Sequence, residues 1–365
     1  MPPPLPPPWP VQRSLIRYKG TEAGIGPESI GPKAPVFWDR GLNVAQEVLT
    51  TKTPQTPKAA RQRRGNWDSK MPILTLLPSI ALLGVFVYGF IGWSGYVSLT
   101  DWNSFIPTLT WAGLRNYVTV LTSFRFQSDL RNIFYFTLLF ILGVLVVGLI
   151  LALLIDQKIR AESLFRSIFI FPMAISFVVT GVIWSWLLNP QTGVNLILKA
   201  FGITGPQWFL STKFVPAFHL GQVNAGIPIA LLAVVLAAVW QMSGFSMAVY
   251  LGGLRAIPEE LKEAARIDGA SAWKTFWSVI FPNLKATTAT IVVVEAAASL
   301  KVFGLIYAMT GAGQDFSTDM PNLNMFQTTF SGDAFAQGAA IAVLILLLMA
   351  AFTVPYVLSV LRGER

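Results

Sequence analysis

The sequence predicts an all-α integral membrane protein with six transmembrane helices and one pair of polar helices on the cytoplasmic side. Only 12% of the 365 residues are charged and 53% are hydrophobic, whereas about a quarter of a soluble domain is charged. Several runs without charge reach the ~20 helical residues that a hydrocarbon core requires. The polar stretch "IPEELKEAARIDGASAWKTFWSVIFPNL", residues 257–284, lies between two apolar runs.

Charged residues mark the ends of the expected spans. No charge occurs between Lys70 and Asp101, or between Arg131 and Asp156. The charge-free run that ends at Arg255 is too long for one span, and its first part, "FVPAFHLGQVNAGIP", is typical of a loop. If that run held two spans, every later loop would change sides. The expected spans lie at about 73–93, 132–155, 168–188, 229–251, 287–309 and 339–361.

The chain divides into an N-terminal extension, residues 1–67, and a membrane domain, residues 68–365. The extension begins "MPPPLPPPWP" and continues as a polar, Pro- and Gly-rich segment. It has no apolar core, so it is not a signal peptide, and its composition favours disorder. A polyproline ligand for a partner and a mis-assigned start codon are the alternatives.

Basic residues orient the chain in the membrane. With the N-terminus inside, the inner segments hold about three times as many Lys and Arg as the outer loops, the distribution expected for cytoplasmic segments. The outer loops hold Arg115, Arg125, Arg131, Lys199 and Lys213. Both termini and residues 257–284 are therefore expected in the cytoplasm.

Residues 257–284 have the signals of two helices joined by a turn. Pro258 suits a first helical turn, where its missing N–H has no cost. Gly269 suits the residue just after a helix, where φ is positive. Ser271 is expected to cap a second helix, in which Trp273, Phe276, Trp277 and Ile280 recur at helical spacing. A solvated amphipathic helix at the lipid headgroups is the simpler interpretation.

One part of this helix pair, "EAARIDGASAWKTFWSVIFP", resembles the cytoplasmic EAA motif of ABC importer permeases. The matching positions are Glu263, Ala264, Ala265, Gly269, Val279, Phe281 and Pro282, with Val279 and Phe281 where Ile and Leu are usual. The resemblance covers about residues 72–361. It implies the type I ABC importer permease fold, in a bacterial or archaeal plasma membrane.

Two further stretches resemble the sugar permeases of the carbohydrate-uptake group, in particular maltose- and glucose/mannose-type members. They are residues 132–195 and "SLKVFGLIYAMTG", residues 299–311. In many relatives an Asp stands at the position of Gly304, and Gly-Gly-Pro follows at residues 312–314. This departure weakens a substrate assignment. Glycerol phosphate or an oligosaccharide therefore remains an alternative cargo to glucose, mannose or a related sugar.

The resemblance also implies partners. A second permease subunit would complete the translocation path, two cytoplasmic ATPase subunits would supply energy, and an extracytoplasmic sugar-binding protein would deliver the sugar. The helix pair would lie in a groove of the ATPase, so Glu263, Ala264, Ala265, Gly269 and Pro282 are the expected coupling residues. This chain would have no catalytic residue, metal or cofactor of its own.

Polar residues within the spans are candidates for the substrate path. A charge at the bilayer centre costs about 2.5–3.5 kcal/mol on insertion scales, so Glu295 and Lys301 are expected to face a cavity or a partner. For Lys301, within about two turns of the outer end of its span, snorkelling to the membrane surface is the alternative. The two lie about 600° apart around a helix, on different faces. Trp240, Gln241 and Ser243 offer the aromatic and hydrogen-bonding groups that sugar sites use, with ordinary helix packing as the alternative.

Other classes of function fit the sequence poorly. The chain has no Cys and one His, His219, which excludes thiol chemistry and a His-rich metal site. A net charge of +9 in a membrane protein indicates cytoplasmic loops rather than nucleic-acid binding. A membrane-embedded enzyme would need a catalytic cluster near one membrane face. A secondary transporter would show an internal repeat and broken spans, and it would not explain the cytoplasmic helix pair.

Overall fold

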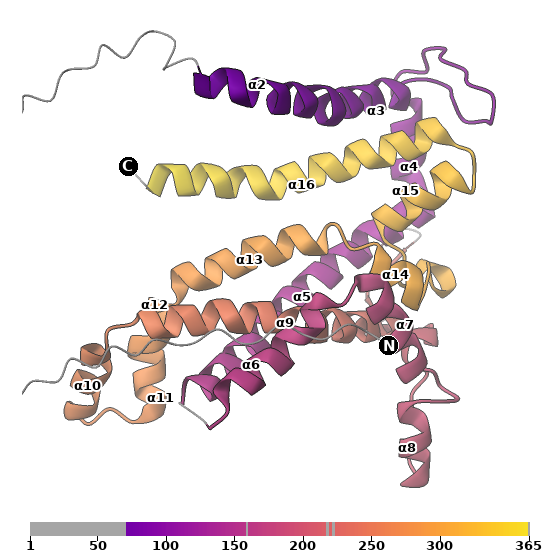
Figure 1. Cartoon of the computed structure of the whole chain (residues 1–365). Coiled ribbons are helices and arrows are strands. Elements are labelled where there is room, and N and C mark those ends of the chain that lie inside the picture. Colours follow the sequence, from indigo (N-terminus) through magenta and orange to yellow (C-terminus); the bar gives the residue numbers. More distant parts are fainter. Residues whose placement is uncertain (1–70, 158–159, 217–218, 221–222, 364–365) are drawn as a thin grey trace, which may run out of the picture. The chain divides into compact units, whose positions relative to one another are not determined.

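The computed structural model describes residues 71–157, 160–216, 219–220 and 223–363. The expected N-terminal extension, residues 1–67, lies outside the described residues. Figure 1 shows that helices dominate the chain from residue 71 onward. They are α2 (Met71–Leu83), α3 (Phe90–Ser98), α4 (Arg115–Thr122), α5 (Phe124–Asp156), α6 (Glu162–Ile170), α7 (Phe177–Leu187), α8 (Val194–Ala200), α9 (Ile229–Ala256), α10 (Glu259–Ile267), α11 (Ala272–Thr275), α12 (Phe281–Asn283), α13 (Lys285–Ser299), α14 (Gly304–Met309), α15 (Pro321–Phe330) and α16 (Phe335–Gly363).

Short elements join these helices. A π-helical turn, Gly84–Gly89, makes α2 and α3 continuous, and 3-10 turns cover Phe171–Ala174, Trp208–Leu210 and Gln314–Phe316. The strands lie in the segment before α9: β1 (Phe214–Val215) pairs with β4 (Ile227–Pro228), and β2 (His219–Leu220) pairs with β3 (Val223–Asn224), both antiparallel. This is the segment that the sequence predicted to be a loop.

Among the described residues, four helices are long and apolar enough to cross a membrane on their own, and six spans result if each of two bent pairs counts as one. The four are Thr75–Ser98, α5, α9 and Phe335–Pro355. The bent pairs are Glu162–Ala174 with α7, at 99°, and Ala272–Asn283 with α13, at 63°. Six apolar spans, as the sequence predicted, are therefore compatible with the structure.

Two of the expected spans are not single straight helices. Residues 168–188 contain a break, because the chain passes through a 3-10 turn at Pro172 before Ser176 caps α7 by accepting a hydrogen bond from the Val179 amide. Residues 287–309 also divide, since α13 ends at Ser299 and α14 begins at Gly304. Pro lacks the N–H that would continue the helix, which explains the first break.

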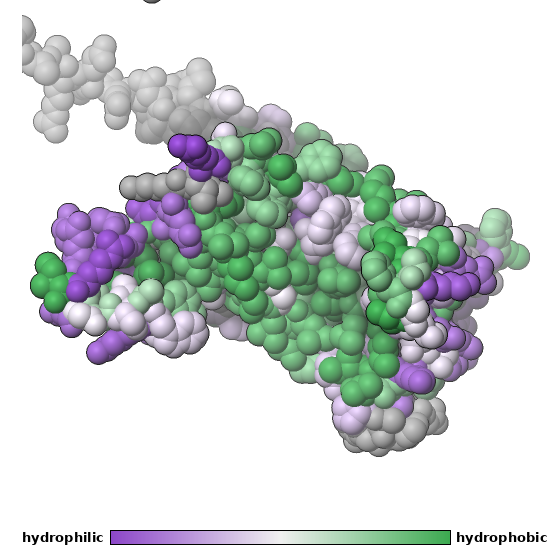
Figure 2. All heavy atoms as spheres, turned by 90° about the horizontal axis from the view of Figure 1, so that it is seen from below, coloured by the Kyte–Doolittle hydropathy of each residue, from purple (hydrophilic) through white to green (hydrophobic). Residues whose placement is uncertain are grey.

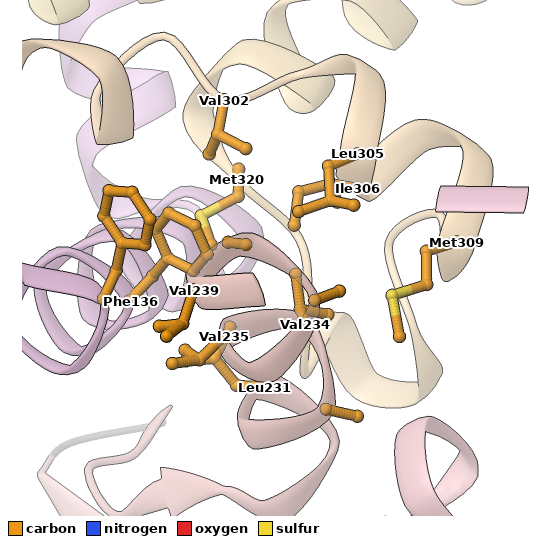
Figure 3. Packing of buried hydrophobic residues seen from close by; sticks show 14 of the residues in the cluster. Phe136, Leu231, Val234, Val235, Val239, Val302, Leu305, Ile306, Met309 and Met320 are labelled. Carbon is orange, nitrogen blue, oxygen red and sulfur yellow. The ribbon is translucent and has the colours of Figure 1, made fainter. Parts of the chain in front are cut away.

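The main apolar core lies where α5 and α9 pack against the segment from Leu300 to Leu323 (Figure 3). Phe136, Val234, Ile306 and Met320 are at most 1% exposed and meet there. Small residues permit the close approach of α5 and α9: a Cβ at Gly148 would lie 2.6 Å from the Cβ of Ser246. Such small-residue contacts are typical of helices that associate in a membrane.

A second cluster lies at the C-terminal ends of α5 and α9. Ile155, Leu254, Ile257 and Leu284 are at most 7% exposed and pack together with five further buried residues. They come from the ends of α5 and α9 and from both ends of the helix pair at 257–284. This cluster fixes the point at which the helix pair leaves the bundle.

Apolar side chains are also abundant on the surface. Figure 2 shows hydrophobic residues gathered over the middle of one face and hydrophilic ones toward its two ends. Val85, Val146, Val182 and Val294 are each 43% or more exposed although they lie on candidate spans. A surface of this kind is expected where lipid is the solvent.

Candidate functional site

The helix pair at residues 257–284, here called the elbow, extends from the C-terminal end of α9 to the start of α13. It consists of α10, a turn, α11, a π-helical turn at Phe276–Ile280 and α12. In Figure 1 it stands at one end of the membrane helices, away from α8. The elbow therefore forms the connection between α9 and α13.

Gly269 forms the turn of the elbow, where the sequence predicted a positive φ. Its φ is +73°. The Gly269 amide donates to the Arg266 carbonyl at 3.0 Å, and the Ala270 amide donates to the Ala265 carbonyl at 2.9 Å. These two bonds are the Schellman pattern, which satisfies the last carbonyls of a helix. The turn is thus held by backbone bonds and by the conformational freedom of one glycine.

The ends of the elbow helices follow their local sequence. The Ser271 hydroxyl accepts a hydrogen bond from the Lys274 amide at 3.3 Å, so the predicted cap of the second helix is present. Pro258 differs slightly from expectation, because it is the capping residue and α10 begins at Glu259. Glu259 and Glu260 lie in the first turn, where negative charge complements the helix dipole.

Pro282 ends the elbow with a π-helical turn. The Phe281 amide bonds to the Phe276 carbonyl, five residues earlier, because the proline ring obstructs the carbonyl four residues before it. The Asn283 side-chain amide donates to the Val279 carbonyl at 2.6 Å, which satisfies one of the carbonyls released by this change. The chain then bends by 63° into α13.

The motif residues lie on the surface of the elbow. Glu263 and Ala264 are exposed and Ala265 is half-buried. Ile267, at the end of α10, is 86% exposed, which is unusual for an isoleucine outside the candidate spans. Within the described part of the chain, this face of α10 is left without an apolar cover.

The other half of the elbow carries a cluster of aromatic rings. Trp273, Phe276, Trp277 and Phe281 contact one another with ring centroids 5.0–6.2 Å apart. Trp273 is 72% exposed. The aromatic side chains of the second helix therefore pack mainly against one another.

The candidate path residues of α9 have different surroundings. Trp240 is 37% exposed and its ring meets that of Trp184 edge-on at 5.8 Å. Gln241 is 1% exposed, and its Nε2 donates to the Ile175 carbonyl at 2.7 Å. Ser243 is buried, with a long bond of 3.4 Å to the Trp240 carbonyl. Gln241 thus supports the break before α7.

Glu295 and Lys301 do not occupy equivalent positions. Glu295 is fully buried within this chain: its Oε1 accepts a hydrogen bond of 3.5 Å from the Ser246 hydroxyl, and its Oε2 has no partner among the described residues. Lys301 is exposed and follows the end of α13. The structure therefore separates these two charges, as their spacing predicted.

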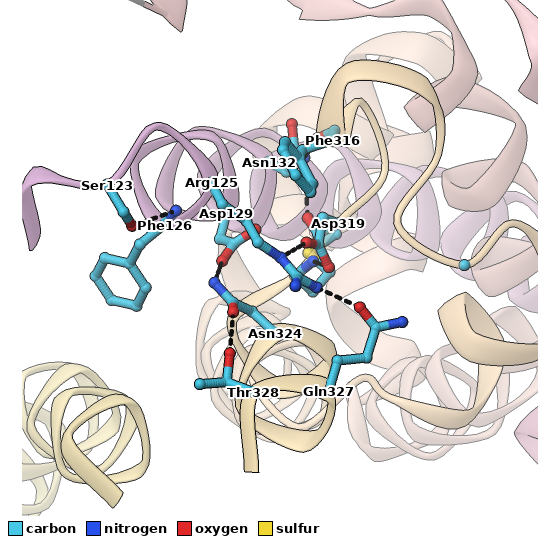
Figure 4. A network of polar contacts seen from close by, with 12 residues as sticks. Ser123, Arg125, Phe126, Asp129, Asn132, Phe316, Asp319, Asn324, Gln327 and Thr328 are labelled. Carbon is cyan, nitrogen blue, oxygen red and sulfur yellow. Dashed lines mark hydrogen bonds and ion pairs between the residues drawn. The ribbon is translucent and has the colours of Figure 1, made fainter. Parts of the chain in front are cut away.

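A polar network near the N-terminal end of α5 was missed by the sequence analysis. Arg125 donates to Asp319 at 2.6 Å and to the Gln327 side chain at 2.5 Å. The buried Asp129 accepts from Asn324 at 2.5 Å. Figure 4 shows these side chains converging from α5, α15 and the loop before α15.

The network explains why α5 begins eight residues before the expected span. Burial raises the pKa of the Asp319 carboxyl, and its hydrogen bond with Arg125 is the largest effect that opposes this rise. Asn132 adds bonds to the carbonyls of Phe316 and Asp319 at 2.7 and 2.9 Å. The charged residues at the start of α5 lie outside the apolar run of the sequence. Residues distant along the chain pair with them, so the helix extends beyond the apolar run.

Comparisons with known proteins agree with this architecture. Residues 144–361 match the family described as binding-protein-dependent transport system inner membrane component. The chain is 38% identical over 293 residues to a probable ABC transporter permease protein of Pyrococcus horikoshii, covering 80% of this chain and 96% of that protein. It is 34% identical over 278 residues to a xylose/arabinose import permease protein of Haloferax volcanii, covering 75% and 83%.

A solved structure has the same fold. It is a bacterial alginate ABC transporter in complex with an alginate pentasaccharide-bound periplasmic protein, and the TM-score is 0.63 at 20% identity, covering 79% of this chain and 94% of that chain. The bent spans therefore belong to an importer permease fold and do not indicate a secondary transporter. The chain is a member of the binding-protein-dependent transport system inner membrane components, the membrane-spanning permease subunits of ABC importers.

Proposed function

We propose that this permease is a subunit of an ATP-driven sugar importer. It forms the translocation path with a second permease subunit, receives sugar from an extracytoplasmic binding protein, and couples to two cytoplasmic ATPase subunits through the elbow. ATP hydrolysis takes place on the ATPase subunits. The N- and C-termini and the elbow lie in the cytoplasm, as the distribution of basic residues indicates.

The exposed face of α10 is the observation that carries this proposal. Glu263 and Ala264 are accessible, Ile267 is 86% exposed, and the turn after them is fixed by backbone bonds. Exposed apolar side chains rimmed by charge are typical of a protein interface. Small residues let a groove of the ATPase approach the helix backbone, while Glu263 supplies a charge that can pair with a basic residue there.

The elbow transmits motion because it is rigid at its turn and at its root, where it joins the membrane helices. Its turn is closed by the Schellman bonds, and its root is buried in the cluster around Ile257 and Leu284. Closure of the ATPase dimer on ATP therefore moves α9 and α13 together with the elbow. This is rigid-body switching between inward- and outward-facing arrangements.

The substrate path involves the polar residues of α9 and α13. Trp240 offers a partly exposed ring for stacking on a sugar, and the exposed Lys301 offers hydrogen bonds near the outer end. Gln241, Ser243 and Glu295 are buried in the present arrangement. Their burial gives them structural contacts here, so Trp240 and Lys301 are the residues proposed to meet the sugar.

The proposed cargo is glucose, mannose or a related sugar. Glycerol phosphate and an oligosaccharide are the alternatives. A phosphorylated cargo would favour basic residues in the path, and the only such residue among the candidates is Lys301. The pentoses in the name of the Haloferax volcanii relative extend the set of sugars to be tested. Titrating the companion binding protein with glucose, mannose, maltose, trehalose, xylose, arabinose and glycerol phosphate identifies the cargo.

Reconstitution tests the function itself. The permease is assembled with its second permease and ATPase subunits in lipid vesicles, and the uptake of labelled sugar is measured with the binding protein on the opposite side from ATP. We expect uptake only when both the binding protein and hydrolysable ATP are present. Uptake driven by an ion gradient without ATP would contradict the proposal.

A further inference from the structure

Arg255 connects the root of the elbow to the turn between α5 and α6. It lies in the last turn of α9, two residues before the elbow begins. Its Nη2 donates to Glu162 Oε1 at 2.7 Å, and its Nε lies 3.8 Å from Asp156 Oδ1. Arg166 also donates to the same Glu162 oxygen. One carboxylate thus joins guanidinium groups from α6 and α9, next to the end of α5.

The backbone around Glu162 is shaped to place this carboxylate. Ala161 has φ +64° and ψ +31°, a left-handed conformation that is unfavourable for a residue with a Cβ. Such residues persist where the surrounding structure holds them, and they concentrate at functional and switching sites. Here the conformation starts α6 with Glu162 in its first turn, facing Arg255.

We propose that Arg255 is a positioning residue that clamps the elbow to α5. The peptide chain joins the elbow directly only to α9 and α13. The ion pairs from Arg255 to Glu162 and Asp156 add polar contacts to the apolar packing of α5 on α9, so that displacement of the elbow is passed to the end of α5 and the start of α6. This inference rests on the proposed function, because it assumes that the elbow receives force from an ATPase.

An open cleft lies next to Arg255, so its ion pairs form a localised contact. A cleft of about 1640 Å³ separates the outer part of the elbow, including Trp273 and Phe276, from the end of α5. Arg255, Asp156 and Glu162 line the same cleft. The charged contact therefore adds to the apolar packing of α5 on α9 and to the buried cluster around Ile257.

The clamp is expected to affect coupling more than stability. Arg255 is 45% exposed and Glu162 27% exposed, and ion pairs as accessible as these contribute little to the free energy of unfolding. Their geometric effect is larger, since a guanidinium held by two carboxylates fixes the direction of the side chain. Loss of the clamp should leave a folded importer that hydrolyses ATP without moving sugar efficiently.

The test measures sugar molecules imported per ATP hydrolysed in vesicles that contain the complete importer. We expect Arg255→Met to lower this ratio about five- to tenfold, within the usual range of coupling energies, and Arg255→Lys to lower it less. The control is Arg115→Met, which removes a basic residue whose ion pair with Asp101 is well exposed at the other end of the bundle. Its ratio should stay at the wild-type value.

Covalent replacement of the clamp provides a second readout. The chain has no cysteine, so the double variant Arg255→Cys, Glu162→Cys can be joined by a short, reducible thiol cross-linker. We expect a low ratio before joining, recovery after it, and loss again on reduction. In each variant, cross-linking of Ile267→Cys to the ATPase reports whether the elbow still docks.

These measurements distinguish a failure of the clamp from a failure of the proposed function. A wild-type ratio in Arg255→Met, with docking intact, would overturn the clamp and leave the proposed function standing. Absence of docking in the otherwise unmodified chain would overturn the proposed function and the clamp together. A reduced ratio with docking intact, restored by the cross-linker, supports the clamp.

Discussion

The side-chain amide of Gln241 donates a 2.7 Å hydrogen bond to the Ile175 carbonyl, at the break between the 3-10 turn and α7. This relationship joins the middle of α9 to the bent span in front of it. Backbone groups that a break releases inside a membrane must find partners within the protein. Gln241 therefore has a structural role that does not depend on contact with sugar.

Replacing this amide should destabilise the permease. We expect Gln241→Leu to lower the free energy of unfolding by about 1 kcal/mol, the usual net value of one hydrogen bond. Ser243→Ala is the control, because among the described residues the Ser243 hydroxyl makes one long hydrogen bond, of 3.4 Å. Thermal unfolding of both variants in detergent measures the difference. Unchanged stability in Gln241→Leu together with lost sugar uptake would instead assign Gln241 to the substrate.

Substitutions at two glycines, compared with each other, isolate the effect of the positive φ at the turn of the elbow. A Cβ added at Gly269 or at Gly252 would meet no described atom within 4 Å, but only Gly269 has a positive φ. We expect Gly269→Ala to cost about 1 kcal/mol and to reduce ATP-dependent uptake. Gly252→Ala, within α9, should be neutral or slightly stabilising. Equal uptake by the two variants in vesicles would show that the turn geometry is unimportant.

Glu263 tests the charge on the exposed face of α10. Because this side chain is exposed, Glu263→Gln should leave insertion and thermal stability unchanged while sugar uptake falls at least about tenfold, the loss expected for one interfacial charge pair. Glu260→Gln, in the first turn of the same helix, is the control and should retain uptake. Full uptake by Glu263→Gln would remove this residue from the coupling surface.

Glu295 should tolerate the loss of its charge. Its carboxylate is fully buried with one long hydrogen bond from Ser246, and burying a poorly paired charge is costly. Glu295→Gln is therefore expected to keep or raise the free energy of unfolding, by about 1 kcal/mol, with uptake preserved. Glu295→Ala should be less stable, because it leaves a cavity. Loss of uptake in a stable Gln variant would place the charge itself in the path.

The polar network near the N-terminal end of α5 should be sensitive to the loss of Arg125. Asp319 is fully buried and depends on Arg125 at 2.6 Å. Removing one partner of a buried ion pair costs about 3–5 kcal/mol, so Arg125→Met should strongly lower the unfolding temperature. Arg115→Met breaks an exposed pair 3.8 Å from Asp101 and should change stability by less than about 1 kcal/mol. Similar unfolding temperatures would show that the network is dispensable.

The sequence was most informative where one residue type has one local role. Gly269 was predicted because a positive φ favours glycine, and Ser271 because its hydroxyl suits a helix cap; both predictions are confirmed. The apolar runs predicted six spans, and the described residues form four helices long enough to cross a membrane, or up to six if each bent pair counts as one. These signals are local, so neighbouring residues were enough to interpret them.

The missed features depend on contacts between distant segments. Arg125 and Asp319 are 194 positions apart, so nothing near Arg125 showed that α5 continues through it. The amide of Gln241 has the chemistry of a sugar site, and only the fold shows that it faces the Ile175 carbonyl. The bend near Pro172 was hidden because the residues around it are as apolar as those of a straight span.

Docking of the elbow on the ATPase is the central claim, and cross-linking in intact membranes tests it most directly. Because the chain has no cysteine, Ile267→Cys in α10 and Phe201→Cys at the end of α8 each introduce a single thiol on an exposed side chain. The account predicts that Ile267→Cys is captured by the ATPase subunit and that Phe201→Cys is not. Capture of Phe201→Cys alone, or labelling of Ile267→Cys by an impermeant reagent from outside, would contradict it.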